Sequence, residues 1–231
     1  MLSGNPNQES IMSFLANSMK TGWLALLARL FLAVLITAHA VSALAASKAD
    51  SPAPNLQIAV FAGGCFWGVD AVFKHVKGVT RVESGYAGGG ADQANYESVS
   101  SGRTGHAEAV RIRFNPAQVS YQQLLQVFFF VAHDPTQLNR QGPDVGSQYR
   151  SAIFFTDPGQ QKTAAEMIEK LTVDRRFGKP VVTQLGALQQ FYPAEPYHQN
   201  YLALHPTQPY IVINDLPKIE HLRKQFPALY Q

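Results

Sequence analysis

The only cysteine in the chain, Cys65, lies in the run Gly63–Gly68, between a pair of glycines and two large aromatic residues. The residues before it, 57–62, are mostly apolar and predict a buried strand. Apolar residues at helical spacing follow and predict a helix over 65–77 that begins at Cys65. Free backbone N–H groups and the helix dipole favour a thiolate there, so we predict a lowered thiol pKa and a nucleophilic cysteine. The alternative is an unreactive, buried Cys65 that acts as a small hydrophobic residue.

A second candidate, Glu108, lies in a segment whose residues alternate between two faces, 106–114. Glu108 shares one face with apolar residues, whereas Arg111 and Arg113 share the other, which predicts a strand with Glu108 toward the core. Burial raises the pKa of a carboxyl group, and a carboxyl that is protonated near neutral pH can act as a general acid. The alternative is a glutamate at a frayed strand end that points to water.

Length and composition restrict the class of protein. The chain has 231 residues and a formal net charge of +3 without a cluster of lysines and arginines, which argues against nucleic-acid binding. Residues 1–46 contain a long apolar stretch that ends in small residues. This stretch predicts a signal peptide or, as the alternative, an N-terminal membrane anchor. Residues 47–55 form a polar, proline-containing linker, and residues 56–231 suffice for one domain with its own core.

Both interpretations of residues 1–46 place the domain outside the cytoplasm. We therefore expect an exported protein that is periplasmic or attached to the outer side of the inner membrane. Exported proteins often contain disulfides, but a single cysteine cannot form an internal one. A free thiol in an oxidising compartment indicates either intermolecular pairing or a reactive cysteine, which adds weight to a functional Cys65.

The order of predicted elements indicates the fold class. Sequence patterns predict strand, helix, strand, strand, helix and strand over 57–62, 65–77, 79–86, 106–114, 121–132 and 150–156. This order is typical of the split β-α-β, or ferredoxin-like, arrangement. We expect an α+β two-layer sandwich with a mixed sheet and extended C-terminal loops. Later elements are helices over 158–171, 196–204 and from a cap at Asp215 to Gln225, and strands over 181–185 and 210–213.

Several separated motifs occur in one order along the chain. They are Gly-Cys-Phe-Trp-Gly at 64–68, Gly-Tyr-Ala-Gly-Gly at 85–89, Thr-Gly-His-Ala-Glu at 104–108, Gln-Tyr-Arg-Ser-Ala at 148–152 and Phe-Tyr-Pro-Ala-Glu at 191–195. With these motifs the chain resembles the A-type peptide-methionine sulfoxide reductases, as a single-cysteine variant. The resemblance implies an enzyme that reduces methionine S-sulfoxide, in oxidised proteins or as free methionine sulfoxide.

The resemblance also implies roles for individual residues. Cys65 resembles the nucleophile that attacks the sulfoxide sulfur, and Glu108 resembles the acid that protonates its oxygen. Tyr86 and Tyr149 resemble the phenols that hydrogen-bond this oxygen. The remaining implied positions are an S-methyl pocket of Phe66 and Trp67, a polar substrate contact at Asp144, and Glu195 and His198 near the site.

The chain has no cysteine after Cys65, so a sulfenic acid on Cys65 must be reduced by an external thiol, such as thioredoxin, glutaredoxin or a small thiol. We expect a monomer without bound cofactor or metal. Two other functions are compatible with Cys65: a module that binds methionine sulfoxide or senses redox state through a sulfenic acid, and a thiol peroxidase. A binding module needs no acid, and the apolar wall beside the sulfur suits a methyl group better than a peroxide.

Overall fold

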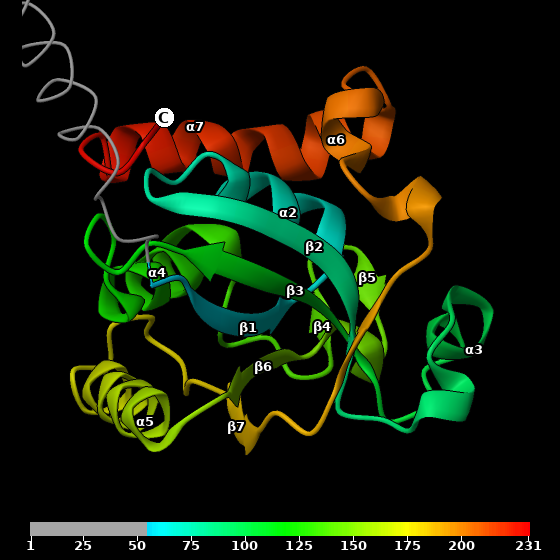
Figure 1. The fold of residues 1–231 in the computed structure, drawn as a ribbon, viewed down its shortest axis with the longest axis horizontal. Helices are drawn as coiled ribbons and strands as arrows, with labels where there is room; N and C mark the ends of the chain where they lie inside the picture. Colours follow the sequence, from blue (N-terminus) through cyan, green and yellow to red (C-terminus); the bar gives the residue numbers. More distant parts are fainter. Residues whose placement is uncertain (1–54) are drawn as a thin grey trace, which may run out of the picture. The chain divides into compact units, whose positions relative to one another are not determined.

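The computed structural model describes residues 55–231, which are drawn in colour in Figure 1. The predicted signal peptide or anchor, 1–46, lies outside the described residues, as does all but the last residue of the predicted linker. In the part of the chain that is described, no helix has both the length and the apolar composition needed to cross a membrane.

A six-stranded sheet forms the centre of the fold (Figure 1). Its strands are β1 Gln57–Gly63, β2 Val79–Ala87, β3 Ala107–Phe114, β6 Ser151–Phe155, β7 Gln184–Ala187 and β8 Phe191–Pro193. They lie in the order β7-β6-β1-β3-β2-β8, and all neighbours are antiparallel except β6 and β7. The predicted α+β class with a mixed sheet is confirmed. The connections β1–β2 and β3–β6 each skip one strand, and β7 and β8 flank these four strands.

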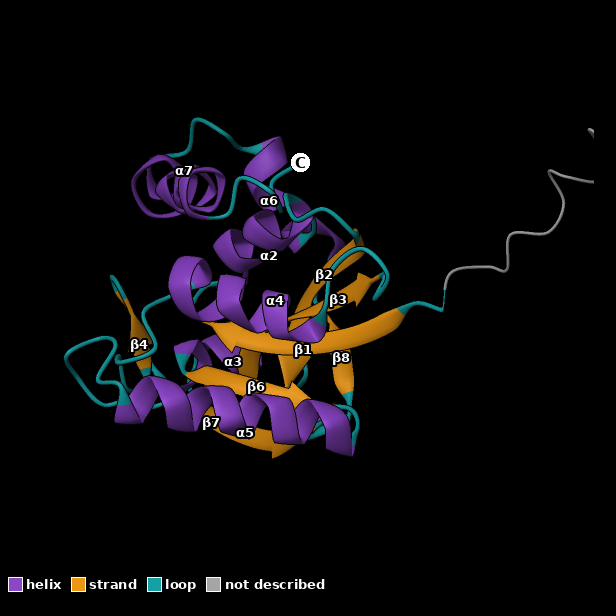
Figure 2. Cartoon of the chain, turned by 90° about the vertical axis from the view of Figure 1, so that its left-hand side faces the viewer, coloured by secondary structure: helices purple, strands orange, loops and turns teal. Residues whose placement is uncertain are grey.

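Helices pack on one face of β1, where the larger part of the core lies (Figure 2). They include α2 Phe66–Lys74, α4 Tyr121–Val127 with a π-helical continuation Phe128–Ala132, and α7 Leu216–Gln225, while α5 Pro158–Val173 lies beside β6 and β7. Phe61 of β1 stacks on Phe128 with 4.9 Å between ring centroids and also contacts Phe73 of α2. Burial of each such ring stabilises the fold by roughly 1.5–3 kcal/mol. The core therefore fixes the two elements, β1 and α2, that meet at Cys65.

Local signals determine where α4 and α5 begin. The Ser120 hydroxyl accepts the Gln123 N–H, and the Gln123 side chain accepts the Ser120 N–H, which is a capping box. Asp157 caps α5 by accepting the Gln160 N–H at 2.9 Å. Both predicted helix starts are confirmed because they depend on neighbours in sequence.

The predicted strand over 210–213 is wrong. Ile211–Asp215 is a π-helical turn that leads into α7. Ile211 is buried beside α2, but Val212 and Ile213 are 45% and 71% exposed. A strand would have returned Ile213 to the side of Ile211, so this apolar run follows helical spacing.

Other C-terminal predictions hold only in part. Asp215 precedes α7 as predicted, but its carboxylate pairs with Lys218 and does not cap the helix. The predicted helix over 196–204 is interrupted at Asn200, which has a left-handed backbone with φ of 56°. The predicted strand over 181–185 forms later, as β7. Short elements in the loops are η1 Ala91–Gln93, α3 Tyr96–Ser100, β4 Arg140–Gln141, β5 Asp144–Val145, η3 Ser147–Tyr149, η4 Pro196–His198 and α6 Tyr201–Leu204.

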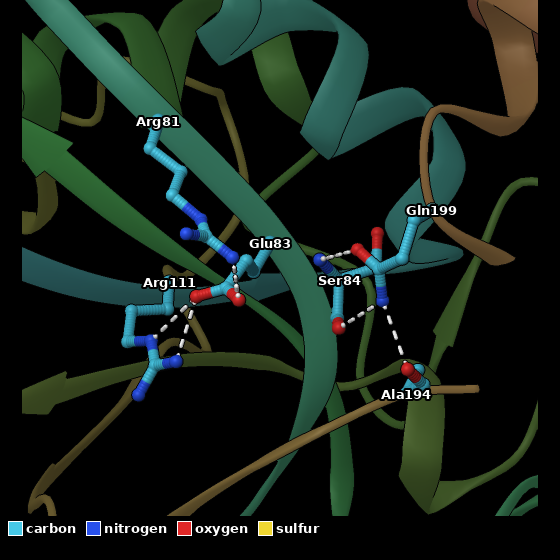
Figure 3. A network of polar contacts seen from close by, with 6 residues as sticks. All are labelled: Arg81, Glu83, Ser84, Arg111, Ala194 and Gln199. Atoms are coloured by element: carbon cyan, nitrogen blue, oxygen red, sulfur yellow. Dashed lines mark hydrogen bonds and ion pairs between the residues drawn. The ribbon is translucent and has the colours of Figure 1, made fainter. Parts of the chain in front are cut away.

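The Gln199 side chain helps to hold the segment after β8 against the edge of β2 (Figure 3). The Gln199 amide accepts the Ser84 N–H at 3.0 Å and donates to the Ser84 carbonyl at 2.9 Å and the Ala194 carbonyl at 3.0 Å. It thus continues the strand pairing where β8 ends. This attachment fixes the chain between Ala194 and Gln199, which includes Glu195 and His198.

Candidate active site

Cys65 lies at the junction of β1 and α2, as predicted. It is the residue before the first turn of α2 and is 9% exposed. Gly64 makes the turn possible, because its φ of +93° is a conformation that residues with side chains rarely adopt. A Cβ on Gly64 would also lie 2.6 Å from Gln141 side-chain carbons. The loop that carries Gln141 is therefore pressed closely against the turn that presents the cysteine.

The prediction of a lowered thiol pKa is wrong. Burial raises the pKa of Cys65 well above its ordinary value, and the charges of Glu108 and Asp215 raise it further. The Trp67 backbone N–H in the first turn of α2 opposes this by hydrogen-bonding the sulfur. The helix start acts as predicted, but burial and two carboxylates outweigh it. The Glu108 contribution disappears when Glu108 is protonated.

Glu108 is buried, which excludes the alternative of a frayed strand end. It is 2% exposed, and its Oε2 accepts the Phe66 N–H at 3.0 Å. Burial is the main cause that raises the pKa of Glu108 to about 8. The hydrogen bond from the Phe66 N–H lowers this pKa, and the Asp144 charge raises it. Glu108 is consequently protonated at neutral pH, beside the first turn of the helix that carries Cys65.

A cavity of about 180 Å³ brings most of the predicted site residues together. Its lining is Cys65, Phe66, Trp67, Tyr96, Glu108, Asp144, Tyr149 and Tyr210. Ligand pockets for drug-sized molecules typically measure roughly 300–1,000 Å³. The aromatic cavity, as we call it, is therefore of a size for one side chain, with an acid and a thiol in its wall.

Trp67 is held rigidly in this wall. Its indole stacks on Tyr201 with ring centroids 3.6 Å apart and planes inclined by 4°, and its N–H donates to His198 Nδ1 at 3.2 Å. The pKa of His198 is lowered because burial outweighs the Glu195 charge, which acts in the opposite direction. A neutral imidazole can accept at Nδ1, so His198 orients Trp67 from behind the cavity without lining it.

Tyr86 is not brought to the cavity. Its hydroxyl donates to Glu195 Oε2 at 2.8 Å, and the other Glu195 oxygen accepts the Tyr96 N–H at 2.9 Å. Tyr96, which the sequence analysis missed, lines the cavity in place of Tyr86. Glu195 thus connects the two tyrosines and positions Tyr96. The signal in the sequence was weak: Asn95 can cap a short helix, and its side chain does accept the Ser98 N–H.

The phenols in the cavity are protonated donors. Burial and the Glu108 charge raise the pKa values of Tyr96 and Tyr149. Tyr210, also missed because its segment was predicted as a strand, donates a short hydrogen bond to Asp144.

In residues 55–231, no cluster of three or more His, Cys, Asp or Glu side chains could hold a metal ion.

Comparison with known proteins shows the family to which the chain belongs. Residues 57–229 match the family described as peptide methionine sulfoxide reductase. The chain is 55% identical over 181 residues to peptide methionine sulfoxide reductase MsrA 2 of Mesorhizobium japonicum, covering 78% of this chain and 93% of the relative. The structure of reduced Mxr1 from Saccharomyces cerevisiae aligns with a TM-score of 0.63 and 32% identity, over 68% of this chain and 89% of Mxr1. Methionine sulfoxide reductase A of Corynebacterium diphtheriae aligns with a TM-score of 0.62 and 33% identity, over 67% and 77% of the two chains.

The chain belongs to the MsrA family of peptide methionine sulfoxide reductases, as its motifs predicted, and is an enzyme that reduces methionine sulfoxide.

Proposed function

We propose that the aromatic cavity, built on a ferredoxin-like core of four strands, binds the side chain of methionine S-sulfoxide, in an oxidised protein or as the free amino acid. One observation carries the proposal: Cys65 and a Glu108 that is protonated at neutral pH line the same side-chain-sized cavity. Phe66 and Trp67 receive the S-methyl group, and the sulfoxide oxygen points to Glu108, Tyr96 and Tyr149.

The roles of the remaining predicted residues follow from their contacts. Asp144 lines the cavity and binds the polar part of the substrate, in an orientation set by Tyr210. Glu195 and His198 position Tyr96 and Trp67. Tyr86 supports Glu195 rather than the sulfoxide oxygen.

In the first half-reaction, the Cys65 sulfur attacks the sulfoxide sulfur while Glu108 protonates the sulfoxide oxygen. The two phenols donate to the oxygen as its charge develops. The oxygen then passes to Cys65, so methionine and a Cys65 sulfenic acid are formed. The sulfoxide gains two electrons and Cys65 loses two, and the proton of the thiol replaces the one that Glu108 gave. This replacement lets a thiol of high pKa react without a separate base.

In the second half-reaction, an external thiol reduces the sulfenic acid. Cys65 is the only cysteine in the sequence, so no resolving thiol is present in the chain. Two thiols, from a thioredoxin, a glutaredoxin or small molecules, are oxidised to a disulfide and one water is released.

We also place the enzyme outside the cytoplasm, in the periplasm or on the outer side of the inner membrane, because of residues 1–46; cell fractionation tests this.

A single-turnover measurement tests the mechanism. The full chain receives excess methionine S-sulfoxide without reductant, and we expect about one methionine per protein and one oxygen added to Cys65. The Cys65→Ser variant is the matched control and should release none, and the R epimer should react far more slowly. A folded protein that releases no methionine and keeps an unmodified thiol would instead support the alternative, a module that binds methionine sulfoxide.

A further inference from the structure

A second cavity, of about 220 Å³, also reaches Cys65. Besides Cys65 and Tyr210, its wall includes the loop 141–144, Asn214 and Lys218. The groups that we propose to hold the sulfoxide oxygen line only the aromatic cavity. Asp144 and its partner Tyr210, like Cys65, line both cavities. Cys65 thus lines two cavities whose other lining residues differ in chemistry.

Lys218 supplies the positive charge in the wall of this second cavity. Its side chain is 20% exposed, and its ammonium pairs with the fully buried Asp215 at 3.1 Å. An ammonium has three donors, so further donors are available to a ligand. The Gln141 amide, in contrast, is uncharged, and it binds the Asp134 backbone through its oxygen at 3.2 Å and one of its N–H groups at 3.1 Å. Lys218 is therefore the group best suited to receive an anion there.

Gly68 allows this charged pair to lie beside the helix that carries Cys65. A Cβ on Gly68 would clash with the Asp215 carboxylate and would lie 2.7 Å from the Lys218 ammonium. The absence of a side chain in the first turns of α2 therefore lets α7 approach closely. The pair is fixed by packing between two helices, which keeps Lys218 at the cavity.

The reaction itself needs a second approach to the sulfur. When a thiolate displaces oxygen from a sulfenic acid, it attacks the sulfur in line with the S–O bond, on the side opposite the oxygen. In the proposed function, the oxygen arrives from the aromatic cavity, among Glu108 and the phenols. The attacking thiolate must then come from elsewhere, and the second cavity is a space that Cys65 lines without those groups.

Resting on that proposed function, we propose that the second cavity receives the cysteinyl thiolate of the reductant and that Lys218 attracts and stabilises it. The thiolate sulfur bonds to the Cys65 sulfur, the S–O bond breaks, and the oxygen leaves as water with the proton that the thiol gave up. A second thiol attacks the mixed disulfide, releases Cys65 and forms the disulfide of the reductant. The cavity is of a size for one side chain, so the rest of the reductant stays outside.

The test compares thiols of opposite charge. Wild-type protein and the double variant Lys218→Met/Asp215→Asn are first converted to the sulfenic acid with methionine sulfoxide. The double substitution removes both charges, so that no buried carboxylate is left without its partner. The loss of sulfenic acid is then timed with 3-mercaptopropionate, which is anionic, and with cysteamine, which is cationic. Lys224→Met, at an exposed position of the same helix, is the matched control.

We expect the rate ratio of anionic to cationic thiol to fall about tenfold in the double variant, because the Asp144 carboxylate then faces the thiolate without a cation. The control should keep the wild-type ratio. A general loss of folding would slow both thiols alike, so it cannot by itself lower the ratio. An unchanged ratio in the double variant would overturn the proposal. Reduced thioredoxin in a parallel arm distinguishes a protein cysteine from a small thiol. Absence of methionine release during loading would count against the proposed function instead.

Discussion

Glu83 and Glu108 lie on neighbouring strands, yet their surroundings move their pKa values in opposite directions. Glu83 of β2 pairs with Arg81 at 2.7 Å and with Arg111 at 2.6 Å (Figure 3). Partial burial raises its pKa, but the hydrogen bonds and charges of Arg111 and Arg81 together lower it. Glu108 of β3 forms no ion pair within residues 55–231, and burial raises its pKa to about 8.

The register explains the contrast. Glu83 lies opposite Arg111 in the β2–β3 pair, whereas Glu108 lies opposite Tyr86. Carboxylates that meet cations stay charged, and carboxyls surrounded by apolar groups and phenols keep their proton. Two glutamates on paired strands thereby differ in charge: Glu83 is ionised between two arginines, and Glu108 keeps its proton beside Cys65.

The largest effect is expected from Glu108→Gln, which keeps the shape of the side chain and removes the acid. Methionine release in a single turnover should slow by about 10²–10⁴-fold at neutral pH. In the wild type, release should fall as the pH rises through about 8, because Glu108 then loses its proton; the variant should lack this fall. Rapid-quench measurements between about pH 6 and pH 10 cover this titration. Glu83→Gln is the control, and a wild-type rate in Glu108→Gln would remove the acid role.

The next effect concerns the phenols around Glu108. Tyr96→Phe and Tyr149→Phe should each slow methionine release about tenfold or more, since each removes a donor to the developing oxygen charge. Tyr86→Phe should leave release close to that of wild type, because its hydroxyl serves Glu195. Single-turnover rates of the three variants decide between Tyr96 and Tyr86. A slower reaction in Tyr86→Phe than in Tyr96→Phe would restore the role that the sequence motifs implied.

A third effect concerns stability. The folded-state pKa of Glu108 lies above its ordinary value of 4.5, so the folded protein holds this proton more tightly than the unfolded chain does. The wild type should therefore lose stability as the pH rises from 4.5 to about 8. Glu108→Gln lacks this loss and should gain stability relative to wild type across that window. Urea unfolding at several pH values measures the difference, and parallel curves would contradict it.

Much of the fold could be predicted because it depends on local signals. The strands beside Cys65 and Glu108 follow from apolar runs and alternation, and the starts of α4 and α5 follow from their caps. The prediction of a strand over 210–213 was wrong because short apolar runs suit a strand and a helix equally. Its conformation is decided by the burial of Ile211 beside α2, which no neighbour in sequence reveals.

The site could be predicted where the elements next to a residue in sequence fix its position, and not where distant segments do. Cys65 and Glu108 depend on β1, α2 and β3 alone, and both lie where the sequence placed them. The thiol pKa was missed because burial raises it most, and the charges of Glu108 and of Asp215, which approaches from α7, raise it further. Tyr96 was missed because its position depends on Glu195, from the segment after β8. Such contacts between distant segments have no periodic signal in the sequence.

The smallest effect, from Glu83→Gln, completes the contrast with Glu108→Gln. Arg81 and Arg111 are partly exposed, so removing the charge should cost about 1 kcal/mol or less and should matter less at high salt. The folded-state pKa of Glu83 lies below 4.5, so its contribution is present above that pH and is lost as the pH falls through the folded-state pKa. Urea unfolding should therefore show the variant and the wild type converging in acid, where Glu108→Gln and wild type converge as well. Above pH 4.5, Glu83→Gln should be less stable than the wild type, and Glu108→Gln should be more stable. A stability gain in Glu83→Gln at neutral pH would mean that the arginines do not compensate the burial of this carboxylate.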